Sequence, residues 1–326
     1  MGIIDDELSE IKKLCEQKIK GSRLVSCVRY MVRVEIKCTA FKTIVSCMQF
    51  TNNYPKTPIL IELKSKTLSE KLLIGLTSVC EHEAKKILGK PQILTILIFL
   101  RNFLDENPLC CCYDEINALK SQLSDPNEVI KLKQRTSQVV IRITNGNYFN
   151  NFKLQVPDKY PDETVFIESV ETNFPPAFYR HMLHQAKEIA RKCVEPPARK
   201  KRNEPIFKAS ASLQKVSEFL IDCIKRLPYE NCQYCNDICF TVDPKDLELN
   251  ENGPKHVERI YCSHLYHMQC LIKYMKTPPF GNKQCPTCRS PIYHHKWTLS
   301  DKLAENRWAH EQAKERELAE VEDFFN

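Results

Sequence analysis

The sequence has no apolar run long enough to cross a lipid bilayer. Its best candidate, ILTILIFL at 93–100, ends at Arg101, well short of the roughly 20 apolar residues that a spanning helix needs. The opening residues, MGIIDDELSE, have neither the basic start nor the apolar centre of an export signal. We therefore expect no membrane association and a reducing location, in the cytoplasm, the nucleus or both.

In such a location, the 17 cysteines among the 326 residues do not predict disulfides. Clustered cysteines there are typical of metal sites or of catalysis. The net charge of +7 indicates an ordinary solvated surface more than one that binds nucleic acid. The basic run at 199–202, RKKR, is open to two interpretations, a nuclear import signal or a solvated loop.

The first 227 residues show one pattern of apolar residues written twice. In the first copy, apolar residues at helical spacing predict a helix, alternating residues predict strands, and a Tyr-Pro pair precedes a further strand. The helical face is Leu8, Ile11, Leu14, Cys15 and Ile19; the alternating residues are Tyr30, Val32, Val34 and Ile36; the pair is Tyr54-Pro55. Later apolar stretches, including residues 93–104, predict closing helices.

The second copy begins with Ile116 and Leu119 on a predicted helical face. Asn145-Gly146 lies between two strand-like stretches and predicts a hairpin, because both residues tolerate positive φ angles. Tyr160-Pro161 follows, 106 residues after the first Tyr-Pro pair, and an apolar helix is predicted over residues 213–227.

This order of a helix, antiparallel strands, a Tyr-Pro turn and closing helices resembles the RWD domain, a relative of the ubiquitin-conjugating enzyme fold. The resemblance implies an α+β fold, with RWD-like domains at residues 1–108 and 109–227 that bind proteins. The family usually has a proline four positions after the first, whereas Pro58 lies three positions after Pro55 and the second copy has none. Conjugating activity would need a cysteine near a His-Pro-Asn turn, which the sequence lacks.

Four pairs of possible metal ligands follow the second copy. They are Cys232 and Cys235, Cys262 and His264, His267 and Cys270, and Cys285 and Cys288. Zinc in structural sites takes four sulfur or nitrogen ligands, so eight ligands predict two ions. The spacing alone leaves open how the pairs are shared between the ions.

The order Cys-Cys-Cys-His-His-Cys-Cys-Cys resembles the two-histidine RING finger, whose pairs interleave. The resemblance implies that Cys232, Cys235, His267 and Cys270 hold the first zinc ion. Cys262, His264, Cys285 and Cys288 would hold the second. We place this cross-brace finger at residues 228–295, followed by a charged helix at 296–326.

RING fingers resembling this one promote ubiquitin transfer from a charged conjugating enzyme to a substrate lysine. Family positions that grip the conjugating enzyme fall on Tyr234, Leu271, Tyr274, Pro286 and Ile292. The linchpin that orients conjugating enzyme and ubiquitin falls on Arg289. Tyr234 replaces the usual aliphatic residue, and Tyr274 stands where tryptophan is common.

Two other interpretations of the finger remain. A plant-homeodomain histone reader would normally have a cysteine at His264 and a tryptophan at Lys283, which argues against it. A zinc-finger scaffold without ligase activity fits the same ligands. The sequence therefore predicts a RING-type ubiquitin ligase, with a non-catalytic assembly protein as the alternative.

Overall fold

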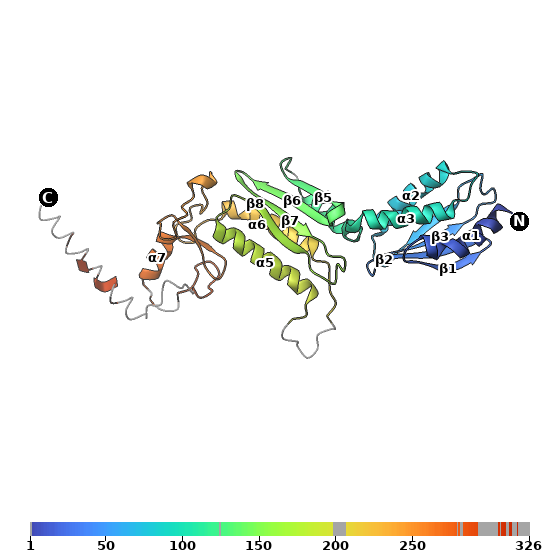
Figure 1. Cartoon of the computed structure of the whole chain (residues 1–326). Coiled ribbons are helices and arrows are strands. Elements are labelled where there is room, and N and C mark those ends of the chain that lie inside the picture. The colour runs from blue at the N-terminus through green and yellow to red at the C-terminus, as the bar shows by residue number, and fades with distance from the viewer. Residues whose placement is uncertain are drawn as a thin grey trace. The chain divides into compact units, whose positions relative to one another are not determined.

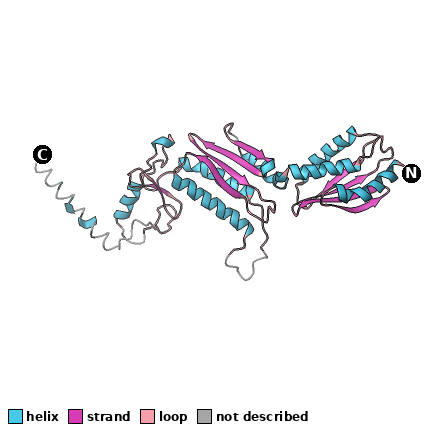
Figure 2. Ribbon diagram, viewed as in Figure 1, coloured by secondary structure: helices cyan, strands magenta, loops and turns pink. Residues whose placement is uncertain are grey.

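In the computed structural model, helices precede and follow groups of consecutive strands along most of the chain (Figures 1 and 2). It describes residues 2–123, 125–197, 207–278, 280 and 283–292, together with 306, 308–310, 313, 314 and 318. The basic run at 199–202 and most of the predicted C-terminal helix lie outside these residues. No helix within the described ranges combines the length and apolarity needed to span a membrane.

The chain divides into two compact units. Unit 1 contains residues 1–143, 150–171 and 179–221, and unit 2 contains residues 144–149, 172–178 and 222–326.

The N-terminal domain lies wholly in unit 1 and consists of one helix, a four-stranded sheet and two closing helices. Helix α1 (Ile3–Lys18) precedes strands β1 (Ser22–Val28), β2 (Met31–Thr39), β3 (Lys42–Gln49) and β4 (Leu60–Lys64). The strands pair in the order β1-β2-β3-β4, all antiparallel. Helices α2 (Glu70–Lys86) and α3 (Ile93–Glu106) follow.

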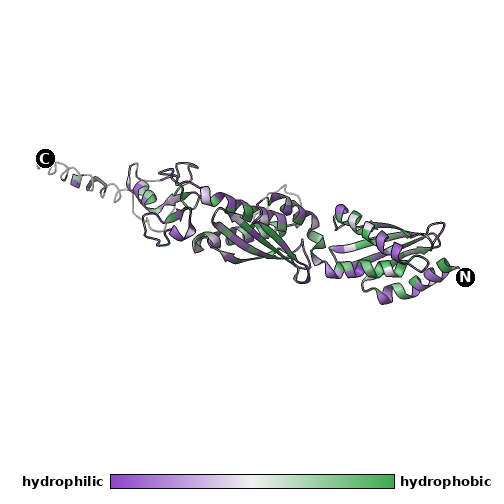
Figure 3. Cartoon of the chain, turned by 90° about the horizontal axis from the view of Figure 1, so that it is seen from above, coloured by the Kyte–Doolittle hydropathy of each residue, from purple (hydrophilic) through white to green (hydrophobic). Residues whose placement is uncertain are grey.

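The periodicity of apolar residues decides which side of each element is buried. On β2, Val32, Val34 and Ile36 are buried at every second position, as the alternation predicts. On α1, Leu8, Ile11 and other residues at helical spacing face the same core. Figure 3 shows the resulting alternation of apolar and polar residues along the strands.

Tyr30 departs from the predicted strand pattern. It lies in the turn between β1 and β2, and 71% of its surface is exposed. The prediction placed it on the buried face because it keeps the two-residue period with Val32. The strand begins only at Met31, however, so the alternation does not extend to the turn.

The next elements repeat the order of the first domain. Helix α4 (Tyr113–Gln122) precedes β5 (Val129–Lys133), β6 (Gln138–Asn145), β7 (Tyr148–Gln155) and β8 (Phe166–Thr172). Helices α5 (Pro176–Val194) and α6 (Leu213–Arg226) follow the strands. The strands form a second sheet in the order β5-β6-β7-β8. The predicted hairpin joins β6 to β7, with Gly146 at a φ of +57° in its turn.

A buried hydrogen-bond network joins three distant segments of the first domain. The Tyr54 hydroxyl donates to the carboxylate of Glu7 on α1. Glu7 also accepts the backbone N–H groups of Gln92 and Ile93, at 2.8 and 2.7 Å, where α3 begins. Gln92 N–H is shared with the Tyr54 hydroxyl oxygen at 3.0 Å. The carboxylate thus satisfies amides that the first turn of a helix leaves unpaired.

The second copy contains the same network. The Tyr160 hydroxyl donates to the carboxylate of Glu115 on α4, at 2.7 and 2.9 Å from its two oxygens. The backbone N–H groups of Ser212 and Leu213 donate to the Tyr160 hydroxyl, and that of Gln214 donates to Glu115, all within 2.9 Å. The Tyr-Pro turns, the first helices and the last helices therefore correspond in the two copies. Both tyrosines belong to the repeated sequence pattern, whereas neither glutamate was predicted from it.

An aromatic cluster holds together the segments of unit 2. The Phe240 ring packs against Tyr148, Phe174 and Phe178, with ring centroids 5.1–6.1 Å apart and steeply inclined planes. The Tyr148 hydroxyl also donates to the backbone oxygen of Thr241 at 2.9 Å. Phe240 is thereby almost completely buried although it follows the first cysteine pair in a loop.

We expect Tyr54→Phe to lower the free energy of unfolding by about 2 kcal/mol, because it removes a hydrogen bond to a buried carboxylate. Tyr160→Phe should have a similar effect. Urea titration followed by circular dichroism would measure both changes. Tyr30→Phe is the matched control, since Tyr30 is exposed. Equal stability of Tyr54→Phe and the control would contradict the role given to the network.

Candidate metal centres

Two cysteine turns and one hairpin build the finger. The Cys232 and Cys235 turn follows α6, and the Cys285 and Cys288 turn follows helix α7 (Met268–Lys276). Between them, β9 (Val257–Arg259) pairs antiparallel with β10 (Leu265–His267), and β10 leads directly into α7.

The two cysteine turns have the same backbone geometry. In the first turn, Asn236 N–H donates to the oxygen of Cys232 at 2.9 Å, and Asn236 has a φ of +64°. In the second, Arg289 N–H donates to the oxygen of Cys285 at 2.8 Å, and Arg289 has a φ of +57°. The left-handed residue after each pair reverses the chain, so that both thiols of a pair reach the same point.

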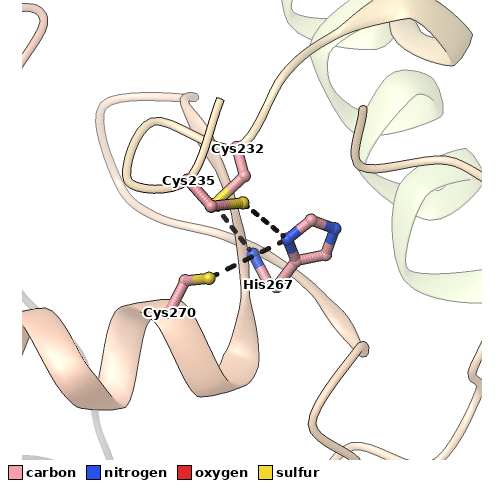
Figure 4. Close-up of side chains that lie close together, drawn as sticks. All are labelled: Cys232, Cys235, His267 and Cys270. Atoms are coloured by element: carbon pink, nitrogen blue, oxygen red, sulfur yellow. Dashed lines mark hydrogen bonds between the residues drawn. The ribbon is translucent and has the colours of Figure 1, made fainter. Parts of the chain in front are cut away.

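The first cluster joins the first and third ligand pairs. Cys232, Cys235, His267 and Cys270 bring their ligand atoms within 4.8 Å of one another. The Nδ1 atom of His267 lies 3.4 Å from Cys235 Sγ and 4.0 Å from Cys270 Sγ (Figure 4). His267 ends β10 and Cys270 lies in the first turn of α7, so the strand-to-helix junction places this pair.

The second cluster joins the second and fourth pairs. Cys262, His264, Cys285 and Cys288 also lie within 4.8 Å of one another by their ligand atoms. The Nδ1 atom of His264 is 3.4 Å from Cys262 Sγ. Both residues belong to the loop of the β9-β10 hairpin, where Ser263 has a φ of +78°. The structure thus brings together the same two groups of four that the RING resemblance implies.

These clusters fit a tetrahedral zinc ion. With zinc–sulfur bonds of about 2.3 Å, ligand atoms in a tetrahedron lie about 3.8 Å apart, which is within the spacing found here. Each cluster offers three sulfur atoms and one imidazole nitrogen and leaves no position for a reacting water. Such a set would hold zinc as a structural ion.

Protonation in the clusters depends on local hydrogen bonds and on burial. Hydrogen bonds from Ser290 lower the pKa of Cys288 to about 6. Burial raises the pKa of Cys262 to about 11 and that of Cys270 to about 12. These two thiols must lose their protons to bind a metal ion, so zinc binding is expected to release protons.

Two neighbouring side chains support ligands without belonging to either set of four. The Tyr266 hydroxyl is completely buried and lies 3.2 Å from Cys285 Sγ. The buried Cys239 thiol donates a hydrogen bond to Cys232 and lowers the pKa of Cys232 to about 3. Neither role was predicted from the sequence. The tyrosine between two ligand residues, and the cysteine four positions after Cys235, were the available signals.

The residues predicted to contact a conjugating enzyme differ in exposure. Tyr234 and Tyr274 pack together with ring centroids 6.0 Å apart, and Tyr234 is 37% exposed. Pro286 is exposed beside the second cysteine turn. Leu271 is completely buried and Ile292 nearly so. These last two residues are therefore buried within the finger and offer little surface to a partner.

Interactions inside the finger hold Tyr274. Its hydroxyl donates to the backbone oxygen of Gln284 at 2.7 Å, and Lys283 Nζ lies 4.5 Å from its ring centroid. Lys283 Nζ also donates to the oxygen of Thr277 at 2.7 Å. The Tyr274 ring is thus fixed in place, with part of it covered by the lysine.

Residues 3–104 match the RWD domain family. The N-terminal domain described above is therefore an RWD domain, a relative of the conjugating-enzyme fold that mediates protein–protein interaction. No curated protein matches the chain significantly.

We expect the protein to bind two zinc ions per chain, as measured by elemental analysis after dialysis against zinc-free buffer. Cys285→Ser should lose at least one ion and destabilise the finger, because each site contributes on the order of 10 kcal/mol to folding. Cys38→Ser is the control, since Cys38 lies far from the ligands in sequence and belongs to the N-terminal domain. A wild-type content below one ion would contradict both sites.

We expect Tyr266→Phe to keep the fold but to release metal about tenfold faster to a colorimetric chelator, since groups that hydrogen-bond ligands strengthen metal binding. Tyr261→Phe, at an 86% exposed position, should release metal at the wild-type rate. The same release rate for both variants would show that the hydroxyl has no effect on the second cluster.

Proposed function

We propose that the protein is a RING-type ubiquitin-protein ligase that acts in the cytoplasm, the nucleus or both. It would bind a ubiquitin-charged conjugating enzyme and promote transfer of ubiquitin to a substrate lysine, with no covalent intermediate on this chain. Its RWD domain and the following RWD-like copy would recruit the substrate or a partner. The pairing of the eight ligands into two interleaved clusters carries this proposal.

Zinc bound in these clusters would hold the finger in one conformation. The ligands on β10, the hairpin loop and α7 then position the tyrosine pair beside the second cysteine turn. Tyr234 and Pro286 offer exposed apolar surface, which is what a conjugating enzyme would contact. Burial of this surface on association would supply much of the binding free energy.

Arg289 is the residue we assign to orientation of the thioester. It is exposed, and the left-handed backbone of the second cysteine turn fixes its position. A guanidinium group has five donors in a planar fork and can contact conjugating enzyme and ubiquitin simultaneously. Holding the thioester in one geometry accelerates lysine attack through orientation.

The recruiting role has support in both copies. The RWD domain at 3–104 links the chain to protein interaction in ubiquitin conjugation. The second copy shares the order of elements and the Glu–Tyr network, which supports a second RWD-like domain at this place.

One observation favours the alternative of a scaffold without ligase activity. Tyr274 uses its hydroxyl inside the finger, and Lys283 covers part of its ring. This leaves a smaller apolar surface for a conjugating enzyme. In the scaffold alternative, the finger would only join subunits of a complex.

The deciding experiment measures ubiquitin discharge onto free lysine from a panel of charged conjugating enzymes. We expect at least tenfold acceleration by the wild type with one of them, equivalent to about 1.4 kcal/mol of transition-state stabilisation. Arg289→Asn should lose this gain, because asparagine tolerates the left-handed backbone but lacks the guanidinium group.

Two controls accompany this assay. Lys276→Ala removes an exposed cation from α7 and should retain the full rate. Elemental analysis must show that Arg289→Asn keeps its zinc. If no conjugating enzyme responds to a zinc-loaded wild type, the scaffold alternative replaces the ligase proposal.

A further inference from the structure

The RWD domain has a groove of about 410 Å³ between its last strand and its second helix. Residues Ile61–Leu63 of β4 line one side, and residues between Glu70 and Glu81 of α2 line the other. The groove lies outside the finger, and the function proposed above does not specify what it binds. Its floor is apolar, since Ile61, Leu63 and Leu73 are buried there, and Ile74 adds an apolar side chain that is 66% exposed.

Strand β4 is an edge of its sheet. It pairs with β3 from Leu60 to Lys64, and no other described strand pairs with its opposite side. Alternate backbone N–H and C=O groups of an edge strand point away from the sheet, where an added strand can pair with them. The groove therefore combines an available backbone edge with a partly apolar helix wall.

The face of α2 that lines the groove has an acidic residue at each end. Glu70, Ile74, Thr77 and Glu81 are spaced four, three and four residues apart, so they lie on one face of α2. Glu62 adds a third carboxylate from β4, although Lys64 pairs with it at 2.9 Å. None of the residues that line the groove is basic.

We infer that this groove binds an extended peptide with basic residues on both sides of an apolar one, by addition of a strand to β4. Glu70 and Glu81 are 11 residues apart on a helix, or about 16 Å at 1.5 Å per residue. On an extended strand, residues four positions apart share a face and lie about 13 Å apart at about 3.3 Å per residue, and the length of lysine or arginine side chains covers the remaining roughly 3 Å. Alternate side chains face the helix, so the motif is basic-x-apolar-x-basic.

In this arrangement, the two basic side chains lie near Glu70 and Glu81, and the apolar side chain packs on Leu73 and Ile74. The backbone of the peptide pairs with β4 and contributes affinity that does not depend on the peptide sequence. The two basic side chains and the apolar side chain of the peptide contribute specificity. This inference deepens the recruiting role proposed above. The inference depends on the RWD domain alone, so it would still hold if the finger had no ligase activity.

A library of random dodecapeptides displayed on phage, selected on the full-length protein, tests this inference. We expect enrichment of the basic-x-apolar-x-basic motif. Selected peptides, measured individually by fluorescence anisotropy, should bind Glu70→Lys/Glu81→Lys at least tenfold more weakly than wild type. Peptides in which both basic residues are replaced by glutamate should recover at least tenfold on this double variant.

Matched variants on α2 separate the groove from general effects. Glu83→Lys changes the same charge at a residue that pairs with Lys86 and does not line the groove, so it should bind as wild type does. Ile74→Ser should weaken binding, whereas Val79→Ser, at another exposed position of α2, should not. All of these positions except Glu83 are exposed, so the fold is expected to be retained.

Three results would overturn the inference. Selection that yields no such motif would exclude it, as would selected peptides that bind the double lysine variant and the wild type equally. Failure of the glutamate peptides to recover would show that charge pairing in the groove does not determine binding. Ubiquitin discharge by the finger is measured separately, so its failure is distinguishable from each of these results.

Discussion

In each αβ copy, a glutamate pairs with the buried tyrosine of the Tyr-Pro turn and joins the first helix to the start of the last helix. Glu7 and Glu115 each sit on the first helix of a copy and accept amide groups where the last helix begins. Burial raises the pKa of both carboxyls. The hydrogen bonds from tyrosine and backbone oppose this effect by stabilising the charged form. In each copy, one glutamate side chain thus joins distant segments, which lie 86 residues apart in the first copy and 99 residues apart in the second.

The periodicity of apolar residues was sufficient to predict most of this architecture. Val32, Val34 and Ile36 are buried at alternate positions, and Leu8 and Ile11 share a helical face. Glu7 and Glu115 were missed because an acidic residue on a helix ordinarily faces solvent, and local patterns do not reveal its distant partners. Their spacing of 108 residues, close to the 106 that separate the tyrosines, was a usable signal. Tyr30 was placed incorrectly because periodicity alone does not show where a strand ends.

In the finger, the metal ligands could be predicted from the sequence, but the exposure of the other residues could not. The spacing of the cysteines and histidines gave eight candidate ligands, and the family resemblance divided them into the two groups that the structure brings together. Exposure was harder to predict, since Leu271 of helix α7 is completely buried while Tyr274 of the same helix is half-buried. The contact between Tyr266 and Cys285 depends on how β10 packs against the second cysteine turn. No short sequence pattern contains that information.

The β9-β10 hairpin and the start of α7 provide ligands to both clusters within nine residues, from Cys262 to Cys270. An ion held by His267 and Cys270 would order the strand that also carries the loop of Cys262 and His264. Binding of the first ion would then already restrict the backbone that carries the second set of ligands, so the second ion would have less conformational entropy to overcome. Occupancy of the two sites would therefore be coupled positively, and a chain with a single ion would be a minor species at equilibrium. Limited zinc would thus divide a population of molecules into complete fingers and empty ones.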